Sequence, residues 1–257
     1  MAVSVYECAS LTQLVYRYGW EKSEKDVVDQ DAHVGFADDT HTVLTALGSW
    51  SRQFIDFSKQ TGFVGAIFVK SKSEVVVAFR GSVSKQKDWL GADVKIAMRK
   101  VPENHFKGGS ELYTKACGSY PSAKITVVGH SLGGGIAQLV AKYHGCRGVT
   151  FNAPGMASHA EKLPTQMPTL GKSGCEVVNF REARDPVSSG TGDHVGIVYD
   201  LNLPQMKENP VQKLVGKGMS HKMGPLVEYI EKQSWKDKSP FESCTAWTEM
   251  GTVGLPV

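Results

Sequence analysis

Short apolar runs alternate with amphipathic stretches along most of this chain. Runs rich in β-branched residues and bounded by turn residues predict strands at 65–70, 74–81, 124–128, 149–151 and 176–181. Apolar residues at helical spacing predict helices at 4–18, 42–59, 132–143 and from about 225 to 230. Strands that alternate with helices indicate an α/β fold built on a parallel sheet, and 257 residues suit one such domain.

The run at 124–128 leads directly into a candidate nucleophile. Residues 129–133 read Gly-His-Ser-Leu-Gly and separate this predicted strand from the helix at 132–143. Strand, sharp turn and helix are the context in which a Gly-x-Ser-x-Gly match indicates a nucleophilic serine, here Ser131. The turn also places the backbone N–H of Leu132 at a helix N-terminus, where it can bind an oxyanion. An ordinary glycine-rich turn is the alternative, so the partners of Ser131 have to decide.

Two segments resemble a known family. Residues 127–135 read Val-Val-Gly-His-Ser-Leu-Gly-Gly-Gly, and residues 149–155 read Val-Thr-Phe-Asn-Ala-Pro-Gly. Both are similar to the core of the class 3 lipases, which include fungal triacylglycerol lipases and plant phospholipases A1. The resemblance implies an α/β-hydrolase fold, with a central mostly parallel sheet flanked by helices, and a single domain over residues 1–257.

The same resemblance assigns roles to residues near the second predicted strand. That strand ends in Phe-Arg-Gly-Ser at 79–82, and in the family this position carries the other half of the oxyanion hole, which implies Ser82. The family places an amphipathic lid next, which corresponds to the lid-like segment 83–104. A helix packed on the sheet is the alternative for this segment. His105, at its end, is interpreted as structural.

The catalytic acid should follow the nucleophile, because the α/β-hydrolase order is nucleophile, acid, histidine. Asp185 comes a few residues after the predicted strand at 176–181. The step Asp-Pro-Val resembles the family segment that bears the acid. Asp193 and Asp200 are rivals, but neither follows a strand in this way. We therefore expect Asp185 to be the acid.

The catalytic histidine has two candidates. His194 lies soon after Asp185, whereas His221 precedes the predicted C-terminal helix. In the family the catalytic histidine lies on a loop that leads into a C-terminal helix, so the resemblance favours His221 over His194. His130, beside the nucleophile, is interpreted as a packing residue.

Composition and charge narrow the class of protein. A net charge of +3 and a pI near 8.5 are compatible with transient contact with an anionic membrane, and no basic run indicates a nucleic-acid partner. The five cysteines form no C-x-x-C pair, which argues against a disulfide framework and a zinc site. The predicted chemistry requires neither a metal nor another cofactor. The sequence leaves the oligomeric state open.

These observations together predict a serine hydrolase that cleaves lipid esters, of the lipase or phospholipase A1 type. An acyltransferase, a feruloyl-type esterase and a silent binding module are the alternatives. The first residues lack a secretory signal, and no run reaches the ~18 apolar residues of a membrane span. We expect a cytoplasmic protein as synthesised, and export without a signal peptide would suit a secreted toxic effector. The tail at 233–257 could pack on the core or bind lipid.

Overall fold

The computed structural model of this protein describes residues 2–17, 44, 47–48, 50–58, 61–82, 101, 103–163, 176–203 and 221–242. Its elements are α1 (Val5–Leu14), the 3-10 turn η1 (Val15–Arg17), β1 (Ser51–Phe57), β2 (Val64–Ser71), β3 (Glu74–Phe79), α4 (Glu103–Ser119), β4 (Lys124–His130), α5 (Leu132–His144), β5 (Arg147–Phe151), α6 (Ala157–Ala160), β6 (Glu176–Glu182), α7 (Pro186–Gly190), β7 (Ile197–Leu201) and α9 (Met223–Glu231). The five predicted strands are confirmed as β2 to β6. None of the helices in these parts of the chain is long and apolar enough to cross a membrane.

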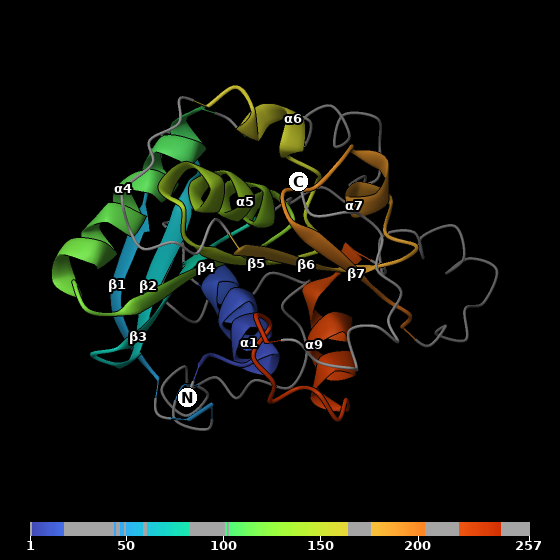
Figure 1. Cartoon of the computed structure of the whole chain (residues 1–257), viewed down its shortest axis with the longest axis horizontal. Coiled ribbons are helices and arrows are strands. Elements are labelled where there is room, and N and C mark those ends of the chain that lie inside the picture. Colours follow the sequence, from blue (N-terminus) through green and yellow to red (C-terminus); the bar gives the residue numbers. More distant parts are fainter. Residues whose placement is uncertain are drawn as a thin grey trace.

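The described strands form one sheet whose spatial order follows the chain, from β1 at one edge to β7 at the other (Figure 1). β1, β2 and β3 pair antiparallel, and β3 to β7 pair parallel. The parallel strands therefore all end on the same side of the sheet. Side chains from distant segments can converge at these carboxyl ends. This mostly parallel sheet flanked by helices is the α/β-hydrolase fold that the sequence predicts.

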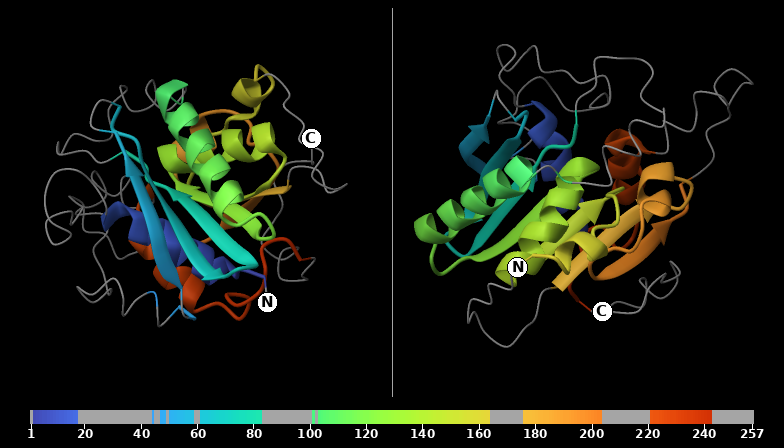
Figure 2. Two further views of the ribbon diagram at one scale, coloured as in Figure 1. Left: turned by 90° about the vertical axis from the view of Figure 1, so that its left-hand side faces the viewer. Right: turned by 90° about the horizontal axis from the view of Figure 1, so that it is seen from above.

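The direction in which strands are added decides which helices cover which face. From β3 to β7 each new strand lies on the same side of the previous one, and right-handed crossovers then leave the connecting helices on one face. α4, α5 and α6 lie on that face, whereas α1 and α9 cover the other (Figures 1 and 2). The second face is thus covered by the first and last helices of the described chain.

Hydrophobic side chains fill the space on both sides of the sheet. In β3, Val75, Val77 and Phe79 belong to the cluster that includes α4 and α5, and Val76 and Ala78 belong to the cluster that includes α1 and α9. All five side chains are completely buried. A strand that is covered on both faces carries apolar residues at consecutive positions. This explains why β3 lacks the alternation of a surface strand.

α1 is fixed at its N-terminus by two sets of hydrogen bonds. The Ser4 hydroxyl accepts the N–H of Glu7 (3.1 Å), and the Glu7 carboxylate accepts the N–H of Ser4 (2.9 Å), which forms a capping box. The N–H groups of Val5 and Tyr6, which have no acceptor inside the helix, donate to carbonyl groups within residues 236–238. The first turn of α1 is therefore joined to the segment that follows α9.

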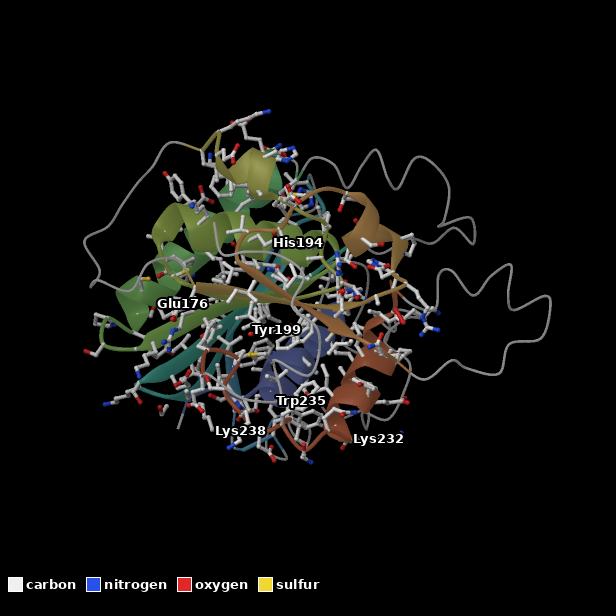
Figure 3. The ribbon with its side chains drawn as sticks, turned by 45° about the vertical axis from the view of Figure 1, so that its right-hand side comes forward. Glu176, His194, Tyr199, Lys232, Trp235 and Lys238 are labelled. Carbon is white, nitrogen blue, oxygen red and sulfur yellow. The ribbon has the colours of Figure 1, made fainter. Side chains whose placement is uncertain are left out.

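That following segment also packs on the sheet. Trp235 is 7% exposed, and its ring stacks on Phe180 of β6 with 6.2 Å between centroids. Phe180 also stacks on Tyr199 of β7, which lies above Trp235 in Figure 3. The first part of the tail, through residue 242, thus packs on the core. Residues 243–257 lie outside the described residues.

The helix predicted at 42–59 is wrong over its described second half. Ser51–Phe57 form β1, an edge strand paired antiparallel with β2. Phe54 packs against the cluster that includes α4, and Ile55 packs against the opposite cluster. Neighbouring apolar residues point to opposite faces of a strand. The apolar residues of this segment therefore serve two faces of a sheet, although their spacing also fits one face of a helix.

Candidate active site

A sharp turn between β4 and α5 carries Ser131. Its backbone angles, φ 56° and ψ −130°, lie in a region that L-residues rarely adopt. Side chains would not fit at the flanking glycines. A Cβ on Gly129 would lie 2.2 Å from the carbonyl oxygen of Gly133, and a Cβ on Gly133 would lie 2.1 Å from that of Phe79. The strand and the helix thus pass close enough together to form the predicted turn.

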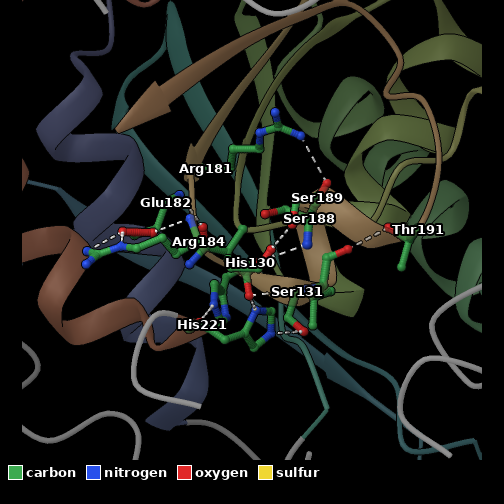
Figure 4. A network of polar contacts seen from close by, with 12 residues as sticks. His130, Ser131, Arg181, Glu182, Arg184, Ser188, Ser189, Thr191 and His221 are labelled. Atoms are coloured by element: carbon green, nitrogen blue, oxygen red, sulfur yellow. Dashed lines mark hydrogen bonds and ion pairs between the residues drawn. The ribbon is translucent and has the colours of Figure 1, made fainter. Parts of the chain in front are cut away.

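His221 lies between Ser131 and Asp185, although 90 and 36 residues separate it from them in the sequence. Its Nε2 is 2.8 Å from Oγ of Ser131, and these two residues lie side by side in Figure 4. Its Nδ1 is 2.9 Å from Oδ1 of Asp185. Each of the three side chains is at most 1% exposed. These are the distances at which an imidazole can take a proton from a hydroxyl while a carboxylate holds its other nitrogen.

The surroundings of Asp185 keep its carboxylate ionised. Asp185 follows β6 and caps α7, where its oxygens accept the N–H groups of Val187 (3.3 Å) and Ser188 (2.9 Å). Burial would raise the pKa of Asp185, but the ring of His221 and the hydrogen bonds from His221 and Ser188 outweigh burial and lower this pKa. An ionised carboxylate only accepts hydrogen bonds, so it holds the proton of His221 on Nδ1. Nε2 then accepts the hydrogen bond of the nucleophile.

The rival candidates for the base and the acid have other surroundings. His194 (labelled in Figure 3) donates from Nε2 to a carbonyl oxygen of α7 at 2.9 Å, and burial lowers its pKa. Asp200 of β7 forms an ion pair with β6, and Asp193 is exposed. The structure therefore brings His221 to Ser131.

The two residues expected to bind an oxyanion lie on separate elements. Leu132 is the first residue of α5, so its N–H has no acceptor inside the helix. Ser82 is exposed, at the end of the stretch 61–82. The residue before it, Gly81, lies against the nucleophile, since a Cβ there would be 3.1 Å from Cβ of Ser131. The loop after β3 is therefore adjacent to Ser131.

The predicted lid lies mostly outside the described residues. Of segment 83–104, the structure describes Val101 and the start of α4. His105, predicted to be structural, belongs to α4, and its ring packs edge-on against Phe63 with 6.3 Å between centroids. Burial lowers the pKa of His105. These contacts fit the structural interpretation of His105.

His130 has polar contacts that its interpretation as a packing residue does not include. Its Nδ1 is 2.7 Å from Oη of Tyr16, and its Nε2 is 2.6 Å from the carbonyl oxygen of His221. Burial, with a smaller effect of the neighbouring His221, lowers the pKa of His130 to about 3. The sequence offers no signal for Tyr16, because it lies in an apolar stretch whose pattern indicates only burial.

The arrangement has the parts needed for acyl transfer: a nucleophile, a base, a buried carboxylate and a helix N-terminus beside the nucleophile. Among the described side chains, no group of three or more His, Cys, Asp or Glu residues could hold a metal ion.

Comparison with known proteins gives a family for most of the chain. Residues 7–188 match the family model described as phospholipase-like, a Tle-like phospholipase domain. The match includes Ser131 and Asp185 and ends before His221. The assignment of His221 therefore depends on its hydrogen bonds and on the sequence around it.

Individual relatives are more distant. ATG15 of Eremothecium gossypii, described as a candidate lipase, is 37% identical over 91 residues, which are 35% of this chain and 16% of that protein. ATG15 of Mycosarcoma maydis, with the same description, is 27% identical over 148 residues, which are 50% of this chain and 28% of that protein. The chain thus spans less than a third of these curated relatives.

Solved structures of fungal lipases are also similar. The propeptide complex of Rhizomucor miehei lipase has a TM-score of 0.46 and 17% identity, over 76% of this chain and 66% of that chain. Lipase II from Rhizopus niveus has a TM-score of 0.42 and 16% identity, over 63% and 71%. Scores this low do not establish a shared fold, so the fold assignment rests on the sheet and its helices.

Proposed function

The chain belongs to the family of Tle-like phospholipase domains, and from this premise we propose that it is a serine hydrolase that cleaves carboxylic esters of lipids through an acyl-enzyme. The observation that carries the proposal is the line of hydrogen bonds from Ser131 through His221 to Asp185, with contacts of 2.8 and 2.9 Å. A serine in a tight turn or a buried carboxylate alone would have many explanations. Their alignment on one imidazole is the arrangement that activates a serine.

In the proposed acylation step, Oγ of Ser131 attacks the ester carbonyl carbon while its proton passes to Nε2 of His221. Asp185 stays ionised and stabilises the imidazolium through Nδ1–H. The carbonyl oxygen gains negative charge, and the N–H groups of Leu132 and Ser82 are the proposed donors to it. The C–O bond of the ester then breaks, and His221 gives its proton to the leaving alcohol.

Water completes the cycle. It attacks the acyl group on Ser131 while His221 takes its proton. His221 then returns this proton to Oγ of Ser131 as the bond between Oγ and the acyl carbon breaks and the fatty acid leaves. Each oxyanion donor typically contributes about 3 kcal/mol to the lowering of the barrier. Because Leu132 would act through its backbone, its side chain can be exchanged without removing that donor.

The proposed substrate is a phospholipid at a lipid surface. The family description names phospholipases, and segment 83–104 has the apolar and basic residues of an amphipathic lid. Triacylglycerol and smaller esters are the alternative substrates that the test distinguishes, because one triad can serve all of them.

The test is product analysis by mass spectrometry after the protein is mixed with phospholipid vesicles and, separately, with a triglyceride emulsion. Wild-type protein should release fatty acid and lysophospholipid, and Ser131→Ala should release neither. A fluorophosphonate probe should label the wild type at Ser131. Absence of both lipid release and labelling would refute the hydrolase. Labelling without lipid release would keep the hydrolase and direct the search to smaller esters.

A pair of histidine variants tests the identity of the base. His221→Gln should lower kcat by at least about 10³-fold, since only oxyanion binding and substrate binding remain. His194→Gln should keep most of the activity, because His194 contacts the backbone of α7. The reverse result would assign the base to His194.

A further inference from the structure

We infer that Tyr16 and His130 are positioning residues for the reaction, because they join the segment of the catalytic base to the loop of the oxyanion hole. The inference rests on the proposed function, since both ends of the connection belong to the proposed catalytic machinery. It arises from a line of hydrogen bonds among four segments that lie far apart in the sequence.

The line runs from the loop after β3 to the base. The N–H of Gly81 is 3.1 Å from Oη of Tyr16, and that hydroxyl is 2.7 Å from Nδ1 of His130. Nε2 of His130 is 2.6 Å from the carbonyl oxygen of His221. These contacts join residues that are 65, 114 and 91 positions apart. They can form only when η1, the loop after β3, β4 and the segment of His221 have come together.

The chemistry of the groups fixes the direction of every hydrogen bond in the line. The carbonyl oxygen of His221 only accepts, so His130 carries its proton on Nε2 and donates it there. Nδ1 of His130 then accepts the hydroxyl proton of Tyr16. The oxygen of Tyr16 accepts the N–H of Gly81. Each donor thus has one acceptor. If Nδ1 of His130 were protonated, the hydroxyl of Tyr16 would lose its acceptor.

The burial of the line keeps it in this state. His130 and Tyr16 are each 5% exposed. Burial lowers the pKa of His130 to about 3, so its ring is neutral near pH 7. Buried hydrogen bonds are costly to break, because each separated group would have no water to replace its partner. The line therefore favours one arrangement of its two ends.

One end of the line limits the movement of the base. His130 is adjacent to Ser131 in the sequence, and its ring lies 4.9 Å from that of His221. Figure 4 shows the three side chains next to one another. Because His130 bonds the backbone of His221, the base is tied to the residue beside the nucleophile. The tie adds to the hydrogen bond that Nδ1–H of His221 donates to Asp185, which holds the far side of the imidazole.

The other end limits the movement of the oxyanion loop. A Cβ on Gly81 would lie 2.3 Å from Oη of Tyr16 and 2.7 Å from the carbonyl oxygen of His130. The backbone at Gly81 is therefore held between Tyr16 and the nucleophile turn. Ser82, the proposed second donor to the oxyanion, follows directly. The hydroxyl of Tyr16 thus fixes the start of the loop that carries this donor.

Three variants test the inference with a soluble probe ester, p-nitrophenyl butyrate. Tyr16→Phe removes one hydroxyl and both of its bonds, and His130→Leu removes both bonds of the imidazole. Each should lower kcat by about tenfold to a hundredfold, since a misplacement of about 1 Å can cost this much. KM should change by less than about twofold. His130→Gln should recover part of kcat, because its amide can donate to the carbonyl of His221 from near the position of Nε2.

Tyr113→Phe is the matched control. Tyr113 lies in α4, is 6% exposed, and its hydroxyl forms a hydrogen bond with Cys117, away from the triad. It should lose about as much thermal stability as Tyr16→Phe and keep the wild-type kcat. If Tyr113→Phe lowered kcat as strongly, the effect would come from general loss of stability and the positioning role would be refuted.

The rate of fluorophosphonate labelling separates this inference from the proposed function. The inference is supported if wild-type protein is labelled at Ser131 and the folded variants at Tyr16 and His130 are labelled about tenfold or more slowly. It is overturned, and the hydrolase kept, if these variants are labelled as fast as the wild type. It is overturned together with the hydrolase if the wild type is neither labelled nor active on any ester. Should His130→Leu fail to fold, Tyr16→Phe, which keeps the ring, decides.

Discussion

Asp185 receives its orientation from two backbone N–H groups of α7 and gives an orientation to His221. Asp185→Asn would keep the size of the side chain, but an amide can also donate to Nδ1. The proton of His221 would then move to Nε2, and a protonated Nε2 cannot accept the proton of Ser131. We expect kcat to fall by about 10⁴-fold, as in other triads. Measured kcat near the wild-type value would show that Asp185 is not the orienting acid.

His130 should make the stability of the protein depend on pH. Its pKa is lowered from 6.5 to about 3, so below about pH 6.5 the unfolded chain binds a proton that the folded protein does not bind until about pH 3. The free energy of unfolding therefore falls as the pH falls through this range, by up to about 1.4 kcal/mol per pH unit. Urea unfolding of wild type and His130→Gln between about pH 7 and pH 4 should give the smaller slope for the variant. Equal slopes would contradict a buried neutral His130.

Single residues differ in how far the sequence identifies them. Ser131 is marked by a local motif, because its turn needs glycines at fixed neighbouring positions. Asp185 is marked by its place after a strand. His221 has a weaker local signal, since its role depends on a fold that brings it across 90 residues to the nucleophile. Tyr16 has none, because its hydrogen bond to His130 is a purely tertiary contact.

Among the elements, the β4–α5 turn has no space for a side chain at Gly133. A Cβ at Gly133 would lie 2.1 Å from the carbonyl oxygen of Phe79 and 2.8 Å from the carbonyl carbon of Arg80, both of them backbone atoms. Gly133→Ala must therefore displace the end of β3, which leads into the loop of Ser82. We expect the free energy of unfolding to fall by about 1–3 kcal/mol. We also expect kcat to lose a larger fraction of its wild-type value than the free energy of unfolding does.

Gly118 in the last turn of α4 is the control for this substitution. No atom lies within 4 Å of a Cβ placed there, and the residue is exposed. Gly118→Ala should raise the free energy of unfolding by about 0.5–1 kcal/mol, because alanine has less freedom in the unfolded chain. Similar losses at Gly118 and Gly133 in urea unfolding would argue against the close contact at the turn.

Elements with one strong pattern could be predicted, and an element with two compatible patterns could not. β2 to β6 are short runs rich in β-branched and aromatic residues, and α5 follows a glycine-rich turn, so their types and approximate limits are predicted correctly. β1 carries apolar residues on both faces of an edge strand, and the same residues also fit one face of a helix. Only its pairing with β2 separates the two interpretations.

At the scale of the whole molecule, the segment after α9 completes the face of the sheet that α1 begins to cover. Trp235 contributes a large buried side chain to this face, stacked on Phe180. Trp235→Ala should lower the free energy of unfolding by about 3–5 kcal/mol, measured by chemical denaturation. Lys232→Ala, at an exposed position nearby, should change it by less than about 0.5 kcal/mol. A small loss for Trp235→Ala would mean that the tail contributes little to the core.

The overall arrangement of the molecule could be predicted mainly from its resemblance to a known family. The family match confirms the predicted class 3 lipase-like character of the chain, and the sheet confirms the α/β-hydrolase fold. The covering of one face by α1 and α9 could not be deduced from their own sequences, because an apolar helix does not indicate which surface it will cover. It follows instead from the order of the strands, which places the described connecting helices α4, α5 and α6 on the opposite face.

The long separation between the proposed nucleophile and the proposed base also has a consequence during protein synthesis. Ser131 leaves the ribosome 90 residues before His221, which corresponds to an interval on the order of 10 s at ordinary rates of translation. The acceptors for the first turn of α1, at 236–238, emerge later still. A nascent or prematurely terminated chain therefore carries the serine without its base and without a completed core. Under the proposed function, only chains whose synthesis has passed the last of these segments would hydrolyse an ester.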